Sequence, residues 1–305
     1  MSKKTLVLTG ANGQLGKTIQ KLWGPAPIHD RFHLLAFDER QLDITDPHSI
    51  QRALNDLKVD LIINAAAYTA VDAAEESEVN AGLAFAVNER GPKNLARWAQ
   101  IADARLVHIS TDFVFDGTAT SPYPTDARPN PAGVYAASKL AGEQGVLQAL
   151  PNHAIILRAS WLYSQYNSNF VKTMLRLLAT RASIAVVDDQ IGAPTSTRSL
   201  SELLFNIAAS ENGNGVYHWS DEGSISWYHF AVAIQEEGVA AGLLAHSIPI
   251  KPITTDEYPT LAARPAYSVL DRSRTEADFA CTARPWREQL KRVIQELAAV
   301  RRDQK

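Results

Sequence analysis

The sequence has few of the residues that build disulfide frameworks and metal clusters. Its 305 residues include two methionines and one cysteine, Cys281. A single cysteine excludes an internal disulfide framework and a metal centre built on cysteine ligands, and it is typical of a reducing compartment. No stretch reaches the roughly 20 apolar residues of a membrane-spanning helix. The first apolar run is short and soon meets a glycine turn, unlike a signal peptide. We therefore expect a cytoplasmic protein with no contact to a membrane.

An excess of positive charge is also missing. Lysine and arginine total 30 residues, aspartate and glutamate total 33, and the formal net charge is −3. Nucleic-acid-binding domains carry a basic patch, so we expect no nucleic-acid partner. Hydrophobic residues make up 46% of the chain, enough for a sizeable core. The length fits one large α/β domain, or a nucleotide-binding domain with a smaller lobe.

The first 160 residues alternate between strand and helix patterns. Short apolar strands are expected at Thr5–Thr9, His33–Phe37, Leu61–Asn64, Arg105–Ser110 and Ala154–Arg158. The longer patterns between them predict helices at Gln14–Leu22, Pro47–Leu57, Ala81–Ala102 and Tyr135–Leu150. Strands this apolar must be covered on both faces, so the pattern predicts an α/β fold with a Rossmann-type doubly wound parallel sheet.

After residue 160 the pattern loosens, and prolines and glycines become frequent. Helices are expected at Asn169–Thr180, Arg198–Ser210 and Pro285–Val300, and a strand at Ile184–Val187. We expect residues 1–160 to form a dinucleotide-binding domain. Residues 161–305 should form mainly a smaller mixed α/β substrate-binding lobe, with some segments returning to the first domain.

Three glycines follow the first strand with Gly-x-x-Gly-x-x-Gly spacing. Gly10 allows the tight turn, Gly13 lets the backbone approach a phosphate, and Gly16 lets the following helix pack on the strand. Backbone N–H groups and a helix N-terminus would then meet the pyrophosphate of a dinucleotide. The turn therefore indicates a cofactor site.

The end of the second strand bears on the choice of cofactor. Asp38 can accept hydrogen bonds from adenosine ribose hydroxyls, which favours NADH. Arg40 could instead meet the 2′-phosphate of NADPH. Asp43 and Ile44 lie where such chains often hold the adenine. The small residues in 64–69, after the third strand, would let a cofactor lie flat. The preference between NADH and NADPH stays open.

Tyr135 and Lys139 lie one helical turn apart and share a face of their helix. A free phenol has a pKa near ~10 and donates a proton reluctantly at neutral pH. A nearby ammonium would stabilise the tyrosinate and lower that pKa. Thr111 follows the fourth strand, where its hydroxyl could bond a substrate carbonyl or steady the tyrosine. These residues together indicate an oxidoreductase.

The glycine turn, Ser110-Thr111-Asp112 and Tyr-x-x-x-Lys, in this order, resemble the extended short-chain dehydrogenase/reductase family. More narrowly, nearly the whole chain is similar to the dTDP-4-dehydrorhamnose reductases of that family. The matching segments are Asn12–Gly16, Asn64–Asp72, Ser110–Gly117, Arg158–Trp161, Asn169-Phe170, Asp189–Thr195 and Arg264-Pro265.

The resemblance implies reduction by NADPH or NADH of the C4 ketone of dTDP-4-dehydro-β-L-rhamnose to dTDP-L-rhamnose, the last step of dTDP-rhamnose synthesis. Tyr135 would be the proton donor, Thr111 its hydroxyl partner and Lys139 the clamp on the nicotinamide ribose. The residues expected to contact the dTDP-sugar are Thr111, Asp112, Trp161, Asn169 and Arg264. Those expected to contact the cofactor are Gly10, Asn12, Gly13, Gln14, Leu15, Gly16, Asp38, Asp43, Ile44, Ala66, Ala67, Tyr68, Thr69, Tyr135 and Lys139.

Two positions depart from the family pattern. Phe113 stands where many relatives have tyrosine, so any role of that hydroxyl is absent. Some relatives hold Mg²⁺ between subunits with acidic side chains, whereas the first helix here carries Lys17-Thr18. The sequence therefore argues against Mg²⁺ and a metal-bridged dimer, while another kind of homodimer stays open.

Two other functions stay open. A nucleotide-sugar epimerase or dehydratase could use the same scaffold, although Asp112 is followed by Phe113 and not by the glutamate that dehydration typically needs. A non-catalytic NADPH-sensing regulator would commonly have lost the tyrosine or the lysine, and this chain has both.

Overall fold

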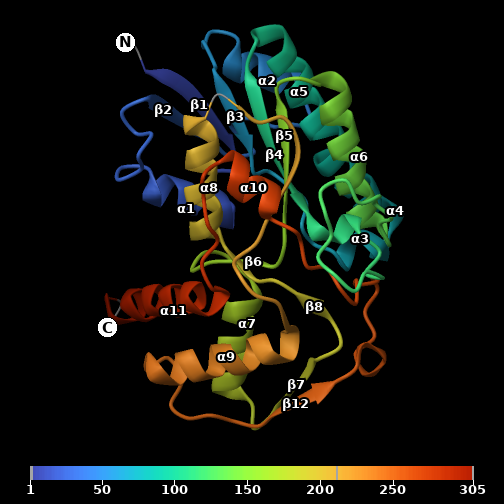
Figure 1. Ribbon diagram of the computed structural model, residues 1–305, viewed down its shortest axis with the longest axis vertical. Helices are drawn as coiled ribbons and strands as arrows, with labels where there is room; N and C mark the ends of the chain where they lie inside the picture. Colours follow the sequence, from blue (N-terminus) through green and yellow to red (C-terminus); the bar gives the residue numbers. More distant parts are fainter. Residues whose placement is uncertain (1–2, 211, 304–305) are drawn as a thin grey trace.

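The computed structural model describes residues 3–210 and 212–303 (Figure 1). Across those residues the main sheet has six strands in the order β10-β5-β4-β3-β1-β2, and every neighbouring pair is parallel. The strands are β1 (Lys4–Thr9), β2 (Phe32–Phe37), β3 (Leu61–Asn64), β4 (Arg105–Thr111), β5 (Ala154–Ala159) and β10 (Gly215–Trp219). The expected Rossmann-type doubly wound parallel sheet is confirmed.

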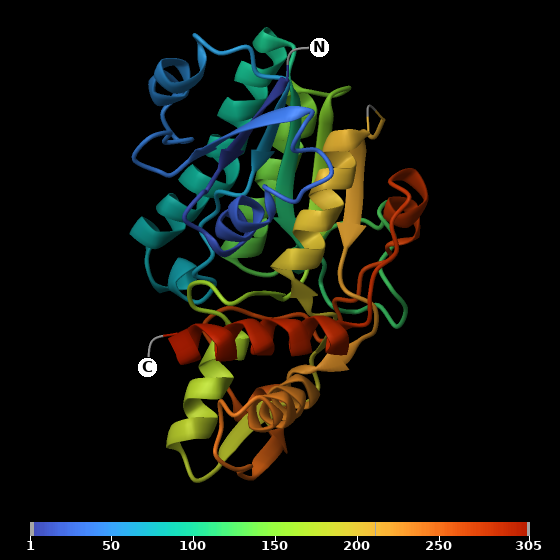
Figure 2. The same ribbon diagram turned by 90° about the vertical axis from the view of Figure 1, so that its left-hand side faces the viewer.

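Helices cover both faces of this sheet, as Figures 1 and 2 show. One face carries α1 (Gln14–Leu22) and α8 (Thr197–Ala209), and the other carries α2 (Pro47–Leu54), α5 (Gly91–Ala102) and α6 (Val134–Ala149). Ile19 and Leu203 lie in the core of the first face, and Leu95 and Val146 in that of the second. Burial on both faces explains why the strands read as continuous apolar runs.

The helix predicted over 81–102 is divided in the structure. It consists of α4 (Glu78–Phe85), a π-helical turn, η1 (Ala86–Arg90), and α5, and the short helix α3 (Ala73–Glu76) precedes it. Gly91-Pro92 opens α5, and proline cannot donate the backbone hydrogen bond that a continuous α-helix requires. The π-turn therefore accommodates a break in the chain's hydrogen-bonding ladder.

A second, smaller core lies below the sheet in Figure 1. Phe230, Leu290 and Val171 are buried in it. Its elements are α7 (Phe170–Thr180), α9 (Trp227–Ala240), α11 (Trp286–Asp303) and the parallel pair β7 (Ile184–Val187) and β12 (Ile250–Ile253). The sequence analysis identified neither α9 nor β10.

The remaining elements are short. Two of the small sheets pair β6 (Leu162–Tyr163) with β9 (Thr195–Ser196), and β8 (Ile191–Gly192) with β11 (Ile225–Ser226). The short helices are η2 (Asp112–Val114), η3 (Thr255–Glu257) and α10 (Ser273–Asp278). Among the described helices, none combines the length and apolar character needed to cross a membrane.

Of the elements that follow residue 160 in the chain, α8 packs on the main sheet and β10 is one of its strands. Helix α8 packs beside α1, where the Thr18 and Thr197 hydroxyl oxygens lie 2.7 Å apart. Strand β10 pairs with β5 along its length. The C-terminal helix α11 runs across the molecule between the main sheet and α9 (Figure 2). The chain therefore passes between the two cores more than once.

Candidate active site

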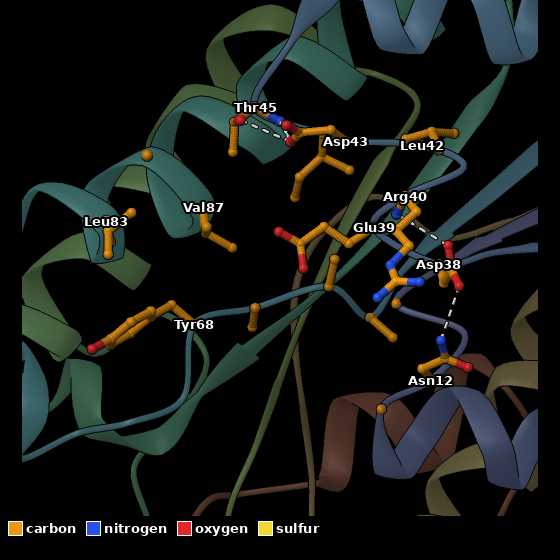
Figure 3. A pocket seen from close by; sticks show the side chains of 17 residues that line it. Asn12, Asp38, Glu39, Arg40, Leu42, Asp43, Thr45, Tyr68, Leu83 and Val87 are labelled. Carbon is orange, nitrogen blue, oxygen red and sulfur yellow. Dashed lines mark hydrogen bonds between the residues drawn. The ribbon is translucent and has the colours of Figure 1, made fainter. Parts of the chain in front are cut away.

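A cavity of about 920 Å³ opens beyond the C-terminal ends of β1, β2 and β3 (Figure 3). The strand order reverses between β1 and β3, and doubly wound sheets bind ligands at such a switch point. Nine of the expected cofactor residues line the cavity: Gly10, Asn12, Gly13, Asp38, Asp43, Ile44, Ala66, Ala67 and Tyr68. The sequence analysis missed six others: Glu39, Leu42, Thr45, Leu83, Ala86 and Val87.

The glycine turn between β1 and α1 is shaped by close backbone approaches. Gly10 has φ +71°, and a Cβ there would lie 2.7 Å from the carbonyl carbon of Ala65. A Cβ on Gly16 would lie 2.3 Å from the carbonyl oxygen of Gly10. Gly13 precedes α1 and has no side chain to cap the first helical N–H groups. Gly13 lines the cavity, so α1 begins at the cavity wall, and the N-terminus of a helix suits a phosphate.

Asp38 organises the loop after β2. Its carboxylate accepts hydrogen bonds from the Asn12 amide at 3.0 Å, from the Arg40 N–H at 3.0 Å and from the Gln41 N–H at 3.1 Å. Figure 3 shows the Arg40 guanidinium between Glu39 and Asp38 at the cavity wall. The acidic and basic groups considered from the sequence therefore lie side by side, and Glu39 adds a second carboxylate.

Other parts of the cavity wall come from the segments after β2 and β3, and from α4 and the π-turn η1. The Asp43 carboxylate accepts from the Thr45 N–H at 2.8 Å, which closes a turn. The Tyr68 N–H donates to Asn88 Oδ1 at 2.9 Å, and the Asn88 amide donates to the Ser138 hydroxyl of α6 at 3.0 Å. Asn88 is fully buried. It fastens the segment after β3 to α6, and nothing in its sequence surroundings predicts that contact.

The other expected cofactor residues lie outside the cavity lining. They are Gln14, Leu15, Gly16, Thr69, Tyr135 and Lys139. Leu15 points from α1 into the hydrophobic core. Gln14 Oε1 accepts a hydrogen bond from the Ser164 hydroxyl at 2.9 Å. Contacts of these residues with a cofactor remain predictions.

Tyr135 lies in the first turn of α6, beside the end of β4. Its ring packs edge-to-face against Phe113, with centroids 6.0 Å apart and planes at 83°. Burial of the phenol raises the pKa of Tyr135 to about 12, while a hydrogen bond with Thr111 lowers it and the charge of Asp112 raises it. The sequence analysis expected the Lys139 ammonium to lower the pKa of Tyr135. In the structure the pKa is raised instead, because burial is the largest influence on it.

Lys139 is buried, and its ammonium is directed at the backbone of β4. Nζ donates to the carbonyl oxygen of Ile109 at 2.7 Å. Burial lowers the pKa of Lys139 to about 8, against the opposing charge of Glu143. Glu143 itself pairs with Arg158, with Nη2 2.6 Å from Oε2, and accepts from the Ser110 hydroxyl at 2.5 Å. The Arg158 that marks the family resemblance thus anchors a buried ion pair behind Lys139.

Thr111 and Asp112 meet Tyr135 at the end of β4. The Thr111 hydroxyl accepts from the Phe113 N–H at 3.2 Å and donates to Asp112 Oδ1 at 3.2 Å. Asp112 is buried, and burial raises its pKa to about 7 although hydrogen bonds from Ser268 and Thr111 oppose the shift. The structure therefore brings together the hydroxyl, the carboxyl and the phenol that the sequence predicts.

The three candidate substrate contacts beyond β5 already have partners within the protein. Trp161, with φ +48°, stacks on Trp227 with centroids 3.4 Å apart and planes at 6°. Asn169 caps α7 by accepting from the Lys172 N–H at 3.1 Å. Arg264 donates twice to the Asp72 carboxylate, at 3.1 and 2.6 Å. Their contacts with a substrate remain predictions.

Comparisons with known proteins identify the family. The family model described as RmlD substrate binding domain matches residues 4–299. A dTDP-4-dehydrorhamnose reductase from Aggregatibacter actinomycetemcomitans is 40% identical over 293 residues, covering 94% of this chain and 97% of the relative. The chain belongs to the dTDP-4-dehydrorhamnose reductase family.

Solved structures agree with this family assignment. The dTDP-4-dehydrorhamnose reductase from Bacillus anthracis, in complex with NADP, is similar with a TM-score of 0.88 and 37% identity, covering 97% of this chain and 100% of that one. UDP-glucose 4-epimerase from Thermus thermophilus, in complex with NAD, has a TM-score of 0.79 at 17% identity, covering 97% and 99%. At that identity the epimerase shows only that the fold is shared.

The sequence analysis weighed Lys17 of the first helix against Mg²⁺. Lys17 of α1 donates from Nζ to Asn167 Oδ1 at 3.0 Å. Across residues 3–210 and 212–303, no group of three or more His, Cys, Asp or Glu side chains is placed to hold a metal ion. The first turn of α1 has no acidic side chain, so it offers no carboxylate ligand for Mg²⁺.

Proposed function

We propose that this chain catalyses the NAD(P)H-dependent reduction of the C4 ketone of dTDP-4-dehydro-β-L-rhamnose to dTDP-L-rhamnose. The observation that carries the proposal is the meeting of Thr111 and Tyr135 where β4 ends and α6 begins. The chain belongs to this reductase family, and a cavity of about 920 Å³ lies at the C-terminal ends of its strands. A cavity of this size at a strand switch point is suited to a dinucleotide.

The cavity residues fit the cofactor. The turn at Gly10–Gly13 and the N-terminus of α1 would hold the pyrophosphate. Asp38 and Arg40 would face the adenosine ribose, and Asp43 would lie by the adenine. When bound, the reduced cofactor supplies the hydride for the ketone carbon.

The protein's own groups manage the proton. The Thr111 hydroxyl would bond the ketone oxygen, and Tyr135 would transfer its phenolic proton to that oxygen as the hydride arrives. Because burial raises the pKa of Tyr135 to about 12, the phenol is fully protonated before the reaction. Lys139, one turn further along α6, is the cation that would offset the tyrosinate charge afterwards and clamp the nicotinamide ribose.

The substrate would lie between the end of β4 and the smaller core. Residues 1–160 would then bind mainly the dinucleotide, and residues 161–305 mainly the substrate. Trp161 would offer its ring to the sugar nucleotide. Arg264 would exchange Asp72 for the diphosphate, to which its planar guanidinium can donate two hydrogen bonds. Asp112 and Asn169 would complete the polar contacts. We also propose a cytoplasmic location and a homodimer without a metal bridge.

The assay combines the purified chain, NADPH and dTDP-4-dehydro-β-L-rhamnose. Loss of the reduced-cofactor absorbance together with dTDP-rhamnose on chromatography is the expected result. A parallel incubation with NAD⁺ and a dTDP-hexose tests for interconversion of C4 epimers. Epimerisation without net reduction would favour the epimerase. A folded chain that binds NADPH but turns over neither substrate would favour the regulator.

A further inference from the structure

The N-terminus of α6 is capped by a residue from another helix. Helix α6 has 16 residues, and its N-cap is Gly133, which has no side chain that could bond the first N–H groups. Five other helices, α2, α4, α7, α8 and α9, are each capped by their own N-cap side chain. At α6 the Val134 N–H donates instead to Glu75 Oε1 at 2.5 Å, across 59 residues of sequence.

The glycine at the start of α6 makes room for this carboxylate. Gly133 has φ +91°, and a Cβ built on it would lie 2.5 Å from Glu75 Oε1. A residue with a Cβ would therefore contact this carboxylate oxygen, and one of the two would have to shift. A negative charge at a helix N-terminus also interacts favourably with the helix dipole. Geometry and charge both suit Glu75 to the position it occupies.

Glu75 joins the cofactor cavity to the first turn of α6. It lies in α3, which follows within a few residues the cavity-lining segment that ends at Tyr68. The residue after its hydrogen-bond partner Val134 is Tyr135. The Asn88 bridge from Tyr68 to Ser138 holds the same turn from its other end, because the Ser138 hydroxyl donates to the Tyr135 carbonyl oxygen at 2.7 Å. Glu75 holds the N-terminal end of that turn, at the residue before the phenol.

We propose that Glu75 is a positioning residue for the reduction: it caps α6 from α3 and thereby fixes the turn that aims the Tyr135 phenol at the ketone oxygen. This inference rests on the proposed function. Glu75 does not touch the reacting atoms, so its effect is on the orientation of the proton donor. Misplacing a reacting group by about 1 Å can cost 10²-fold in rate.

The experiment compares Glu75→Ala, Glu75→Asp and Glu75→Gln with the matched control Glu76→Ala. Glu76 is exposed in the same short helix, and its carboxylate accepts a hydrogen bond from the Asn80 amide at 3.5 Å. We expect Glu75→Ala to lower kcat by about 10-fold or more, with KM for NADPH unchanged. Glu75→Gln, whose amide oxygen still accepts from Val134, should recover most of the rate. Glu75→Asp keeps the charge but shortens the reach, so it should lose rate as alanine does.

The opposite outcomes would overturn the proposal. They are a wild-type kcat in Glu75→Asp, or a glutamine variant as slow as the alanine variant. Should Glu75→Ala fail to fold, the Asp and Gln variants still decide between these outcomes.

Amide hydrogen exchange provides a readout that does not need turnover. We expect faster exchange over residues 134–138 in Glu75→Ala and Glu75→Asp, and no change in Glu76→Ala. Unchanged exchange in the Glu75 variants would show that the carboxylate does not hold the turn, and would refute the proposal. A wild-type chain that exchanges as expected but has no reductase activity would defeat the proposed function instead, because the cap would then be present without the chemistry.

Discussion

The side-chain amide of Asn169 donates to Gln14 Oε1 at 2.9 Å, across 155 residues of sequence. The same amide also donates to the carbonyl oxygens of Ser164 and Tyr166, at 2.8 and 3.2 Å. Gln14 begins α1 directly after the glycine turn, and Asn169 caps α7 in the smaller core. One residue expected at the cofactor and one expected at the substrate thus hold each other. The contact ties the start of α1, beside the glycine turn, to the smaller core.

We expect Asn169→Ser to lower the free energy of unfolding by about 1–2 kcal/mol. The serine hydroxyl can still cap α7, so the loss would come from the amide donor that links α7 to Gln14. Urea unfolding of the variant and the wild type measures the difference. Equal stability would show that the bond between α1 and α7 contributes nothing measurable.

Replacing Tyr135 with phenylalanine should lower kcat by about 10²–10⁴-fold, the usual contribution of a positioned general acid. The ring and its edge-to-face contact with Phe113 would remain, so NADPH binding should stay largely intact. Steady-state rates and cofactor fluorescence titration measure the two quantities. A variant whose rate is within a few-fold of wild type would remove Tyr135 from the mechanism.

Both NADPH and NADH should serve as hydride donors, because Asp38 and Arg40 line the same cavity. Asp38→Asn keeps an acceptor oxygen for the Arg40 and Gln41 N–H groups and removes the charge that repels a 2′-phosphate. We expect the ratio of kcat/KM for NADPH over NADH to rise by about 10-fold, which corresponds to ~1.4 kcal/mol. An unchanged ratio would show that Asp38 does not face the ribose.

Arg264→Ala should raise KM for the sugar nucleotide strongly, with a smaller effect on kcat, if the guanidinium binds the diphosphate equally in ground and transition states. Asp72→Asn separates this role from a structural one, because it weakens the pairing but keeps Arg264. We expect the asparagine variant to keep or lower KM. An equal rise of KM in both variants would identify the pair as a structural tether.

Stability should fall as pH rises through the range in which two buried carboxyls titrate. Burial raises the pKa of Asp221 to about 7, and that of Asp112 likewise to about 7. The native state therefore binds protons that the unfolded chain, with an aspartate pKa of ~3.9, releases between about pH 4 and 7. Since the native state binds more protons across this window, each unit rise in pH costs stability.

Asp221→Asn should remove the Asp221 part of that dependence. The asparagine oxygen can still accept from the Ser196 N–H, and its NH₂ can donate to the Ser199 hydroxyl oxygen. Melting temperatures at about pH 5 and pH 8 should therefore differ less in the variant than in the wild type. Identical slopes in the two proteins would show that Asp221 keeps an ordinary pKa.

The sequence predicted the elements whose pattern is local. Strand β3, with both faces buried, and the glycine turn at Gly10 follow from neighbouring residues alone. Strand β10 begins at Gly215, beyond a glycine- and asparagine-rich stretch, and becomes a strand because β5 offers it an edge. Helix α9 carries apolar residues around most of its circumference, which hides the helical period.

The site shows the same division between local and tertiary causes. Asp38 could be predicted because it directly follows a strand, and Leu83 could not, since helix packing alone brings α4 to the cavity wall. The spacing of Tyr135 and Lys139 correctly places them in one helix. It does not reveal that the ammonium bonds the carbonyl oxygen of Ile109 on β4.

The return of α8 and β10 to the sheet limits how this protein can be divided or recombined. A fragment ending at residue 160 would lack β10, and the unpaired edge of the apolar strand β5 would be free to template aggregation. Exchanging the smaller core for that of a relative would therefore require splice points on both sides of the segment that contains α8 and β10. To exchange the smaller core with a relative, several segments that are separate in the sequence would have to be transferred together.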